Sequence, residues 1–159
     1  MKNFHLNDID DYYRFIKENG YTVVYVTKAW NGQNEATAVW FGNNHPLNIS
    51  KFATQGPAAD IQACVEAVQI AYRNDITRLM IKTDIPYVYH SMTNWIHKWR
   101  RNGWQTVNET DVRDRRDFII LDHNCELLDD IVWELIDDQE DFDCCQEAKL
   151  FARQSLPRH

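Results

Sequence analysis

The sequence has few residues that break or cross-link a chain, and it lacks any long apolar run. Its 159 residues include 5 Gly, 4 Pro and 4 Cys, and no repeat or low-complexity linker marks a second folded unit. No apolar stretch approaches the roughly 20 residues that a membrane-spanning helix needs, and the N-terminus lacks the apolar segment of a signal peptide. We therefore expect one folded domain without a membrane partner, inside the cell in the nucleus or the cytoplasm.

The few cysteines exclude a disulfide framework and a zinc site. They form no Cys-x-x-Cys pair, and no histidine stands at zinc-ligand spacing from any of them: Cys64, Cys125, Cys144 and Cys145. Adjacent cysteines such as the last two rarely bond to each other. His90 and His97 also lack a carboxylate at ligand spacing. We expect reduced, mostly buried thiols and no metal ligands among these residues.

Positive charge is also scarce. Lys and Arg number 17 against 24 Asp and Glu, which gives a net charge of −7. That sign excludes a surface that binds phosphate backbones over most of its area. Any nucleic-acid contact must be local, and residues 83–106, TDIPYVYHSMTNWIHKWRRNGWQT, gather three tryptophans and several basic side chains. The aromatic content of 13% and the hydrophobic content of 44% exclude a disordered chain.

The apolar periodicity predicts an α/β fold. Five segments rich in β-branched and aromatic residues are expected to be strands, namely residues 21–27, 35–42, 45–53, 78–84 and 131–136. The segments with helical spacing of apolar residues are 8–19, 58–73, 86–95 with a second piece to 102, 111–122 and 144–154. A helix between the third and fourth strands implies a parallel crossover, so we expect a mixed five-stranded sheet flanked by helices.

This order of elements, with an aspartate at the end of the fourth strand, resembles a type 1 ribonuclease H. Three motifs carry the resemblance, namely FGNNHPLNIS at 41–50, the segment 83–106, and EAKLFAR at 147–153. Together they cover about residues 21–154. The resemblance implies a ribonuclease H-like domain at 21–159, and the apolar helical pattern adds an N-terminal helical extension at 1–20.

The resemblance also implies where the catalytic groups would stand. In this family four carboxylates converge on two divalent cations, which activate a water and stabilise the leaving oxygen of a phosphodiester. Two of the four matching positions keep a carboxylate, Asp60 and Asp84, and two have lost it, Thr27 and Lys149. A loop histidine of the family falls on or near Gln139. The chain is thus a divergent homologue in which half of the metal ligands are replaced.

The replacements favour a site without a metal ion. Lys28 and Lys149 stand beside or at the vacated positions, and we expect the ammonium of Lys149 to pair with Asp84 or Asp60 in place of a cation. We therefore expect no catalytic residues, no metal and no cofactor. In the alternative, acidic residues of the run 137–143 rebuild a Mg²⁺ or Mn²⁺ site with the two aspartates, although a run of charge on a surface loop is usually a solvated face.

The nucleic-acid side of the resemblance is only partly kept. In the family a tryptophan-bearing protrusion holds the DNA strand and a polar groove reads the 2′-hydroxyls of the RNA strand. Residues 53–57, ATQGP, lack the arginine and asparagine of that groove. The contacts expected on the protrusion come from Trp95, Lys98, Trp99, Arg100 and Arg101. Trp95 is the best candidate, and any binding should be weak and salt-sensitive.

Three functions follow as hypotheses. The first is a catalytically inactive ribonuclease H-like domain that serves as a binding module, for a protein partner above all and for nucleic acid through the protrusion. The second is a divergent metal-dependent endonuclease that cleaves RNA in RNA/DNA hybrids with Asp60 and Asp84 as its residual ligands. The third is a protein that binds RNA/DNA hybrids or duplexes without cleaving them.

Overall fold

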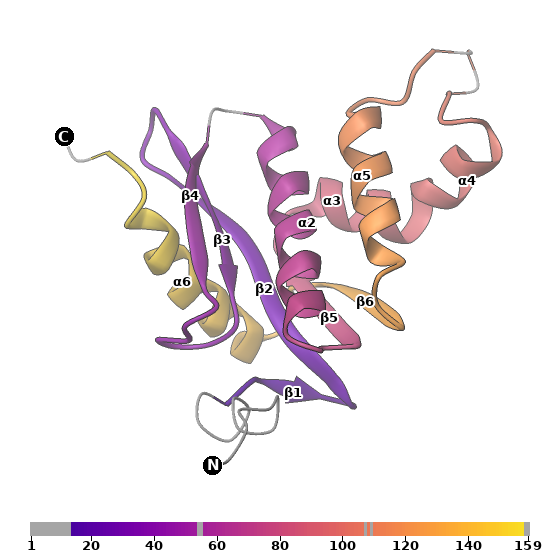
Figure 1. The fold of residues 1–159 in the computed structure, drawn as a ribbon. Helices are drawn as coiled ribbons and strands as arrows, with labels where there is room; N and C mark the ends of the chain where they lie inside the picture. Colours follow the sequence, from indigo (N-terminus) through magenta and orange to yellow (C-terminus); the bar gives the residue numbers. More distant parts are fainter. Residues whose placement is uncertain (1–13, 54–55, 107, 109, 158–159) are drawn as a thin grey trace.

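The computed structural model describes residues 14–53, 56–106, 108 and 110–157 (Figure 1). The strands are β1 Lys17–Glu18, β2 Tyr21–Trp30, β3 Glu35–Trp40, β4 Ile49–Ala53, β5 Arg78–Thr83 and β6 Asp130–Leu135. The helices are α2 Pro57–Arg73, α3 Pro86–His90, the π-helical turn η1 Ser91–Trp95, α4 Ile96–Arg101, α5 Arg115–Cys125 and α6 Gln139–Arg153. None of the helices in these described ranges is long and apolar enough to cross a membrane.

The sheet is mixed, as the sequence predicts. Its strands run in the order β4-β3-β2-β5-β6, with antiparallel pairs in the first half and parallel pairs between β2, β5 and β6. These are the five expected strands, and the two-residue β1 adds a sixth by pairing with the start of β2. Val26 lies opposite Thr83, the last residue of β5, so Thr27 of β2 and Asp84 lie next to each other at the point where β5 ends.

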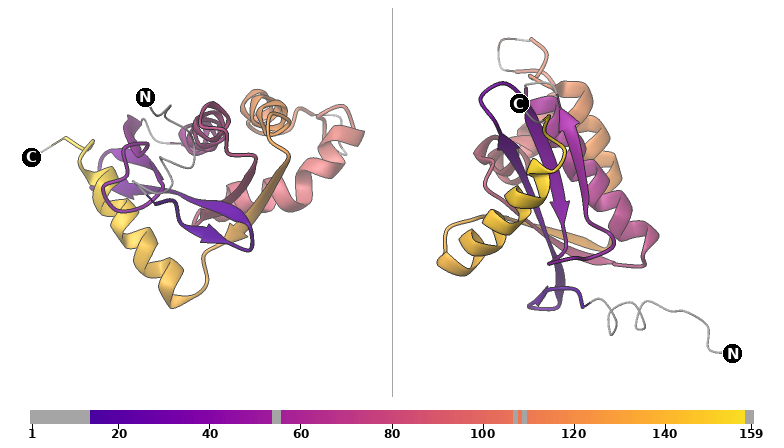
Figure 2. Two further views of the ribbon diagram at one scale, coloured as in Figure 1. Left: turned by 60° about the horizontal axis from the view of Figure 1, so that its bottom comes forward. Right: turned by 90° about the vertical axis from the view of Figure 1, so that its left-hand side faces the viewer.

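Helices cover both faces of the sheet. Helices α2 and α5 pack on one face and α6 crosses the other (Figure 2). Helix α2 begins at Pro57, a favoured first-turn residue, and buries Ile61, Cys64 and Val68 at helical spacing. These side chains join the main core, while α6 closes a second cluster around Tyr25 and Met80. The core therefore holds β2 and β5, which carry the candidate site, between two layers of helix.

The expected helix at 8–19 is wrong in the part that the structure describes. Lys17 and Glu18 form strand β1, and Asn19 and Gly20 turn the chain back onto β2 with φ of 51° and 84°. An Asn-Gly pair with two positive φ angles is the favoured two-residue hairpin turn, and it outweighs the helical spacing. Phe15 is buried against the rings of Phe41 and His45. Residues 8–13 lie outside the described residues.

Two other expected elements begin later than predicted. The third strand was expected at 45–53 but starts at Ile49, because the side chain of Asn48 organises a turn before it. Its Oδ1 accepts a hydrogen bond from Phe41 N at 2.6 Å and its Nδ2 donates to Gly42 O at 2.7 Å. The helix expected at 111–122 lies at 115–125, since Asp114 before it has a φ of 57° and cannot belong to a right-handed helix.

The last helix begins earlier than predicted. It was expected at 144–154, yet α6 starts at Gln139. Asp138 caps the helix, because its side chain accepts a hydrogen bond from Asp141 N at 2.8 Å. Acidic residues in the first turn are also favoured by the helix dipole. Most of the run 137–143 is therefore the first part of a helix rather than a surface loop.

Candidate functional site

The carboxyl ends of β2 and β5 open into a cleft of about 920 Å³. The start of α2 and the second half of α6 form two of its other walls, together with residues around Pro86 at the start of α3. The two retained aspartates line this cleft, as does Lys149. The structure therefore brings together Asp60, Asp84 and Lys149, three positions that the sequence singled out.

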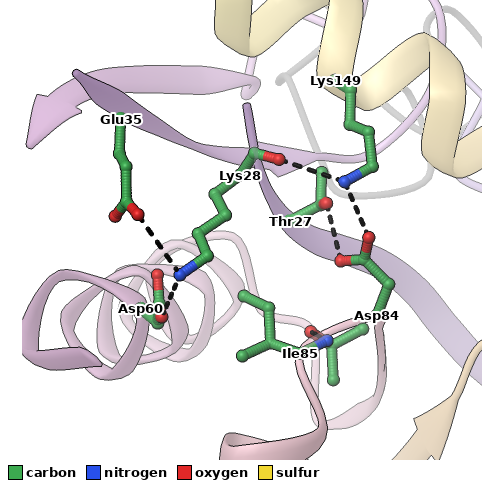
Figure 3. A network of polar contacts seen from close by, with 8 residues as sticks. Thr27, Lys28, Glu35, Asp60, Asp84, Ile85 and Lys149 are labelled. Carbon is green, nitrogen blue, oxygen red and sulfur yellow. Dashed lines mark hydrogen bonds and ion pairs between the residues drawn. The ribbon is translucent and has the colours of Figure 1, made fainter. Parts of the chain in front are cut away.

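Asp84 is held on both of its oxygens (Figure 3). Thr27 Oγ1 donates to Oδ1 at 2.7 Å, and Lys149 Nζ lies 2.7 Å from Oδ2. The same ammonium donates to the backbone oxygen of Lys28 at 3.1 Å. The ion pair expected between Lys149 and Asp84 is thus present. Two residues at replaced ligand positions now act as hydrogen-bond and charge partners of a retained aspartate.

Asp60 has a lysine partner of its own. Lys28 Nζ donates to Asp60 Oδ2 at 3.1 Å and lies 3.8 Å from Glu35 Oε1 (Figure 3). Asp60 is only 2% exposed, and this burial raises the pKa of its carboxyl although the charge of Lys28 opposes the shift. Among the described residues, Asp60 Oδ1 and Glu35 Oε2 have no hydrogen-bond partner.

Glu35 is the site residue that the sequence analysis missed. It opens β3 opposite Trp30, so the β2–β3 hairpin brings it back to Lys28. The signal in the sequence was the turn NGQN at 31–34, which fixes that hairpin. Hairpin register depends on the loop length together with the turn type, so the loop had to be bounded at residues 31–34 before Glu35 could be placed opposite Trp30.

The donor set does not fit the two divalent cations that the family uses. Hard cations of this kind take several oxygen ligands, and the two retained carboxylates are each paired with an ammonium instead. An ammonium that attracts the carboxylate also repels a divalent cation placed beside it. Within the described ranges no cluster of three or more His, Cys, Asp or Glu side chains could hold a metal ion.

The acidic run lies away from this cleft. Asp141 is buried and accepts hydrogen bonds from Lys82 at 2.8 and 3.0 Å and from Tyr25 at 2.7 Å. Lys149 follows eight residues later, roughly 12 Å along the helix. Gln139, where the family's loop histidine was expected to fall, pairs with Asp143 at 2.9 Å. The geometry gives no support to a metal site rebuilt from residues 137–143.

The thiol beside the site is a packing group. Cys145 is buried, and its Sγ donates to Thr27 Oγ1 at 3.6 Å. Burial raises the pKa of this thiol to about 11, despite the hydrogen bond to Thr27. It is therefore protonated near neutral pH, which excludes a thiolate nucleophile at this position.

The protrusion is formed by α3, η1 and α4, and its tryptophans differ in exposure. Trp95 is 43% exposed, whereas Trp99 and Trp104 pack against the main core. The three rings follow one another with centroids 6.2 and 6.0 Å apart, and Trp99 lies 5.2 Å from the ring of Phe118. Trp95 is thus the tryptophan of the protrusion that presents most surface to a ligand.

The basic residues of the protrusion also differ. Arg100 makes two hydrogen bonds to Asp122, one of them from Nε at 3.0 Å. Lys98 and Arg101 are exposed. Two of the three basic residues expected to contact a strand therefore lie on the surface, and the third, Arg100, is bound to Asp122 of α5. On the RNA-strand side, residues 54–55 lie outside the described residues.

Comparisons with known proteins agree with this fold. The family model described as RNase H matches residues 21–138. Mouse (Mus musculus) ribonuclease H1 is 32% identical over 130 residues, which cover 78% of this chain and 45% of that protein. The chain therefore spans about half the length of the curated relatives it matches.

Solved structures show the same fold at low identity. A foamy viral protease-reverse transcriptase in complex with an RNA/DNA hybrid superposes with a TM-score of 0.67 and 17% identity, covering 84% of this chain and 19% of that one. The solution structure of the PFV RNase H domain superposes with a TM-score of 0.63 and 13% identity, covering 85% of this chain and 95% of that one. The strand order and the position of Asp84 after β5 are those that the sequence resemblance implies, and the family model covers most of the sequence. The chain therefore belongs to the type 1 ribonuclease H family.

Proposed function

We propose that this ribonuclease H domain no longer cleaves and acts as a binding module. The observation that carries the proposal is the contact of Lys149 Nζ with Asp84 Oδ2 at 2.7 Å. A second lysine neutralises the other retained aspartate in the same way. An ammonium supplies positive charge, but it does not generate a metal-bound hydroxide at neutral pH. The domain therefore functions without catalytic residues, metal or cofactor.

Nucleic acid is the partner that the surface favours. Trp95 is exposed beside the exposed cations Lys98 and Arg101, and an aromatic face next to positive charge suits a sugar-phosphate strand. The foamy viral neighbour was solved with an RNA/DNA hybrid. A hybrid bound at the protrusion without cleavage is accordingly the first candidate.

A protein partner is the second candidate. Phe142 and Leu150 lie on the outer surface of α6 and are both more than half exposed. Exposed apolar side chains of this size are natural anchors for another chain.

The cysteines support a location inside the cell, in the nucleus or the cytoplasm. All four are free thiols, as is usual in reducing compartments.

The test is cleavage of an end-labelled RNA/DNA hybrid at low salt, with Mg²⁺ and separately with Mn²⁺ and with protein in excess. We expect intact hybrid that is nevertheless shifted into a complex on a native gel. The protein is compared with Asp84→Asn and with Asp75→Asn, an identical change at an exposed residue beyond the far end of α2. Metal-dependent cutting that disappears only in Asp84→Asn would overturn the proposal and restore the endonuclease hypothesis.

A further inference from the structure

We infer that the cleft between β2, β5, α2 and α6 binds a nucleotide unit directly, without a divalent cation. The phosphate lies against Lys149 and Arg153, and the base stacks on Trp30. The inference rests on the proposed function, since it assumes that the cleft serves binding rather than cleavage. It adds a second contact surface, separate from the protrusion, and a ligand class, a nucleotide that is free or ends a single strand.

The charge of the cleft is opposite to that of the whole chain. Three carboxylates line it, and so do four cationic side chains, Lys28, Arg113, Lys149 and Arg153. The cleft is therefore net positive, while the chain carries −7. Low-dielectric concave walls concentrate the field of this small excess of positive charge. An anion is attracted here without an added metal ion.

Two of these cations have N–H donors that a ligand can use. Lys149 makes two contacts, to Asp84 and to the backbone of Lys28, which leave one of its three N–H donors for a ligand. Arg153 stands one helical turn further along α6, on the same side. It is exposed and its side chain pairs with no residue of the described ranges. A guanidinium with five donors next to an ammonium suits the oxygens of a phosphate.

Trp30 supplies the aromatic wall. It ends β2, two residues after Lys28 and on the same face of the strand, and it lines the cleft. Its side chain is 59% exposed, and no ring contact joins it to another residue that the structure describes. An indole that contributes so little to the core is free to stack on a base, which is how proteins hold single strands without reading sequence.

The size of the cleft limits the ligand. About 920 Å³ lies within the range of pockets for small molecules, and it suits one or two nucleotides better than a duplex. Two sources share this chemistry, a free nucleoside monophosphate and the phosphorylated end of a single strand.

The experiment measures fluorescence anisotropy of a 5′-phosphorylated, 3′-fluorescein-labelled dT8, in EDTA and in Mg²⁺, over a series of salt concentrations. We expect dissociation constants within twofold of each other in EDTA and Mg²⁺. Trp30→Ala should weaken binding about tenfold, and Arg153→Ala should lower the slope of log K against log salt by about 0.7. Tyr72→Ala and Arg73→Ala, at the far end of α2 and roughly 24 Å from Pro57, are matched controls and should change nothing.

Competition by unlabelled UMP separates the two sources. Displacement of dT8 identifies a free nucleotide as a sufficient ligand, and binding that resists UMP assigns the site to a strand end. Absence of dT8 binding, loss of binding in EDTA, or equal effects of Trp30→Ala and Tyr72→Ala would overturn the inference. Absence of dT8 binding while hybrid binding is present and is lost in Arg101→Ala would sink this inference and leave the proposed function standing, whereas metal-dependent cleavage would remove the proposed function itself.

Discussion

Lys149 shows how one substituted side chain changes the electrostatics of a site. A carboxylate at this position would lie beside Asp84 and repel it unless a cation or a proton intervened. The ammonium attracts Asp84 instead and also satisfies a backbone oxygen. The two side chains are 23% and 29% exposed, so the pair is neither a screened surface contact nor a fully buried one.

Replacing Lys149 by Met should lower the free energy of unfolding by about 1–2 kcal/mol, between the values for exposed and buried ion pairs. Lys51→Met is the matched control, because its pair with Glu66 is more exposed and should contribute less than about 1 kcal/mol. Urea denaturation of both variants, and of each combined with Asp84→Asn, measures the coupling. Equal losses in the two lysine variants, or no coupling to Asp84, would contradict a stabilising role for the pair.

The sequence predicts this pair but only part of the site. Asp60, Asp84 and Lys149 were placed by the motifs around them, because a motif fixes its position on a strand or helix. The sequence does not predict the second partner of Lys28, since Glu35 reaches it only through the register of the β2–β3 hairpin. Which lysine neutralises which aspartate depends on side-chain reach across the sheet edge, and no periodicity encodes that.

At the scale of elements, one buried lysine joins four of them. Lys82 lies on β5 beneath α6 and contacts Asp141 of α6 at 2.8 Å and Glu18 of β1 at 2.7 Å. Glu134 of β6 is 3.8 Å away. The sequence shows only a polar interruption in an apolar strand, because the acidic partners come from distant segments. The same network explains why the acidic run forms a helix start that is fixed to the sheet.

Lys82→Met should destabilise the fold by about 3–5 kcal/mol, because it leaves Asp141 buried without its cation. Burial lowers the pKa of Lys82, but its hydrogen bonds and charge contacts with Asp141 and Glu18 outweigh this, so the folded pKa lies above the ordinary value of 10.5. The stabilisation is therefore complete below about pH 10.5 and is lost as the pH rises through the folded pKa.

Urea unfolding of the wild type and Lys82→Met from pH 7 to 11.5 tests this sign. The difference in unfolding free energy should stay constant up to about pH 10 and shrink above it. Asp141→Asn, which keeps the lysine and removes one charge, serves if the first variant does not fold. A difference that grows with alkaline pH would refute the assignment of the stabilisation to a charged Lys82.

Element boundaries depended on single residues. The strands and helices with long apolar patterns, such as α2 and β5, lie where their periodicity placed them, because burial of one face decides them. Lys17–Glu18 became a strand through the Asn19-Gly20 turn, and α6 gained a turn through the cap at Asp138. Such local hydrogen bonds and backbone angles outweigh spacing where the apolar pattern is short.

At the scale of the whole molecule, charge is distributed unevenly. A chain of net −7 gathers cations beside an exposed tryptophan on two separate surfaces, the protrusion and the cleft. Because most of the surface repels phosphate, a bound strand contacts few cations, and its affinity should fall with salt by a small slope. Within the protrusion, Lys98 and Arg101 are free to meet a strand, while Arg100 is engaged by Asp122.

Substitution of the two neighbouring arginines separates binding from stability. Arg101→Ala should leave the unfolding free energy within about 0.5 kcal/mol of wild type and reduce the salt slope of hybrid binding by about 1. Arg100→Ala should cost about 1–2 kcal/mol of stability, since the buried Asp122 loses a bidentate partner, and it should change the salt slope less. Anisotropy with a labelled hybrid from 25 to 200 mM salt, alongside urea melts, measures both quantities.

The comparison of the two salt slopes identifies the contact surface. If Arg100→Ala lowers the slope as much as Arg101→Ala does, the ion pair with Asp122 opens on binding and both arginines contact the strand. If neither variant changes the slope, the protrusion is not the contact surface. The cleft beside Lys149 and Arg153 then remains as the place where a strand can bind.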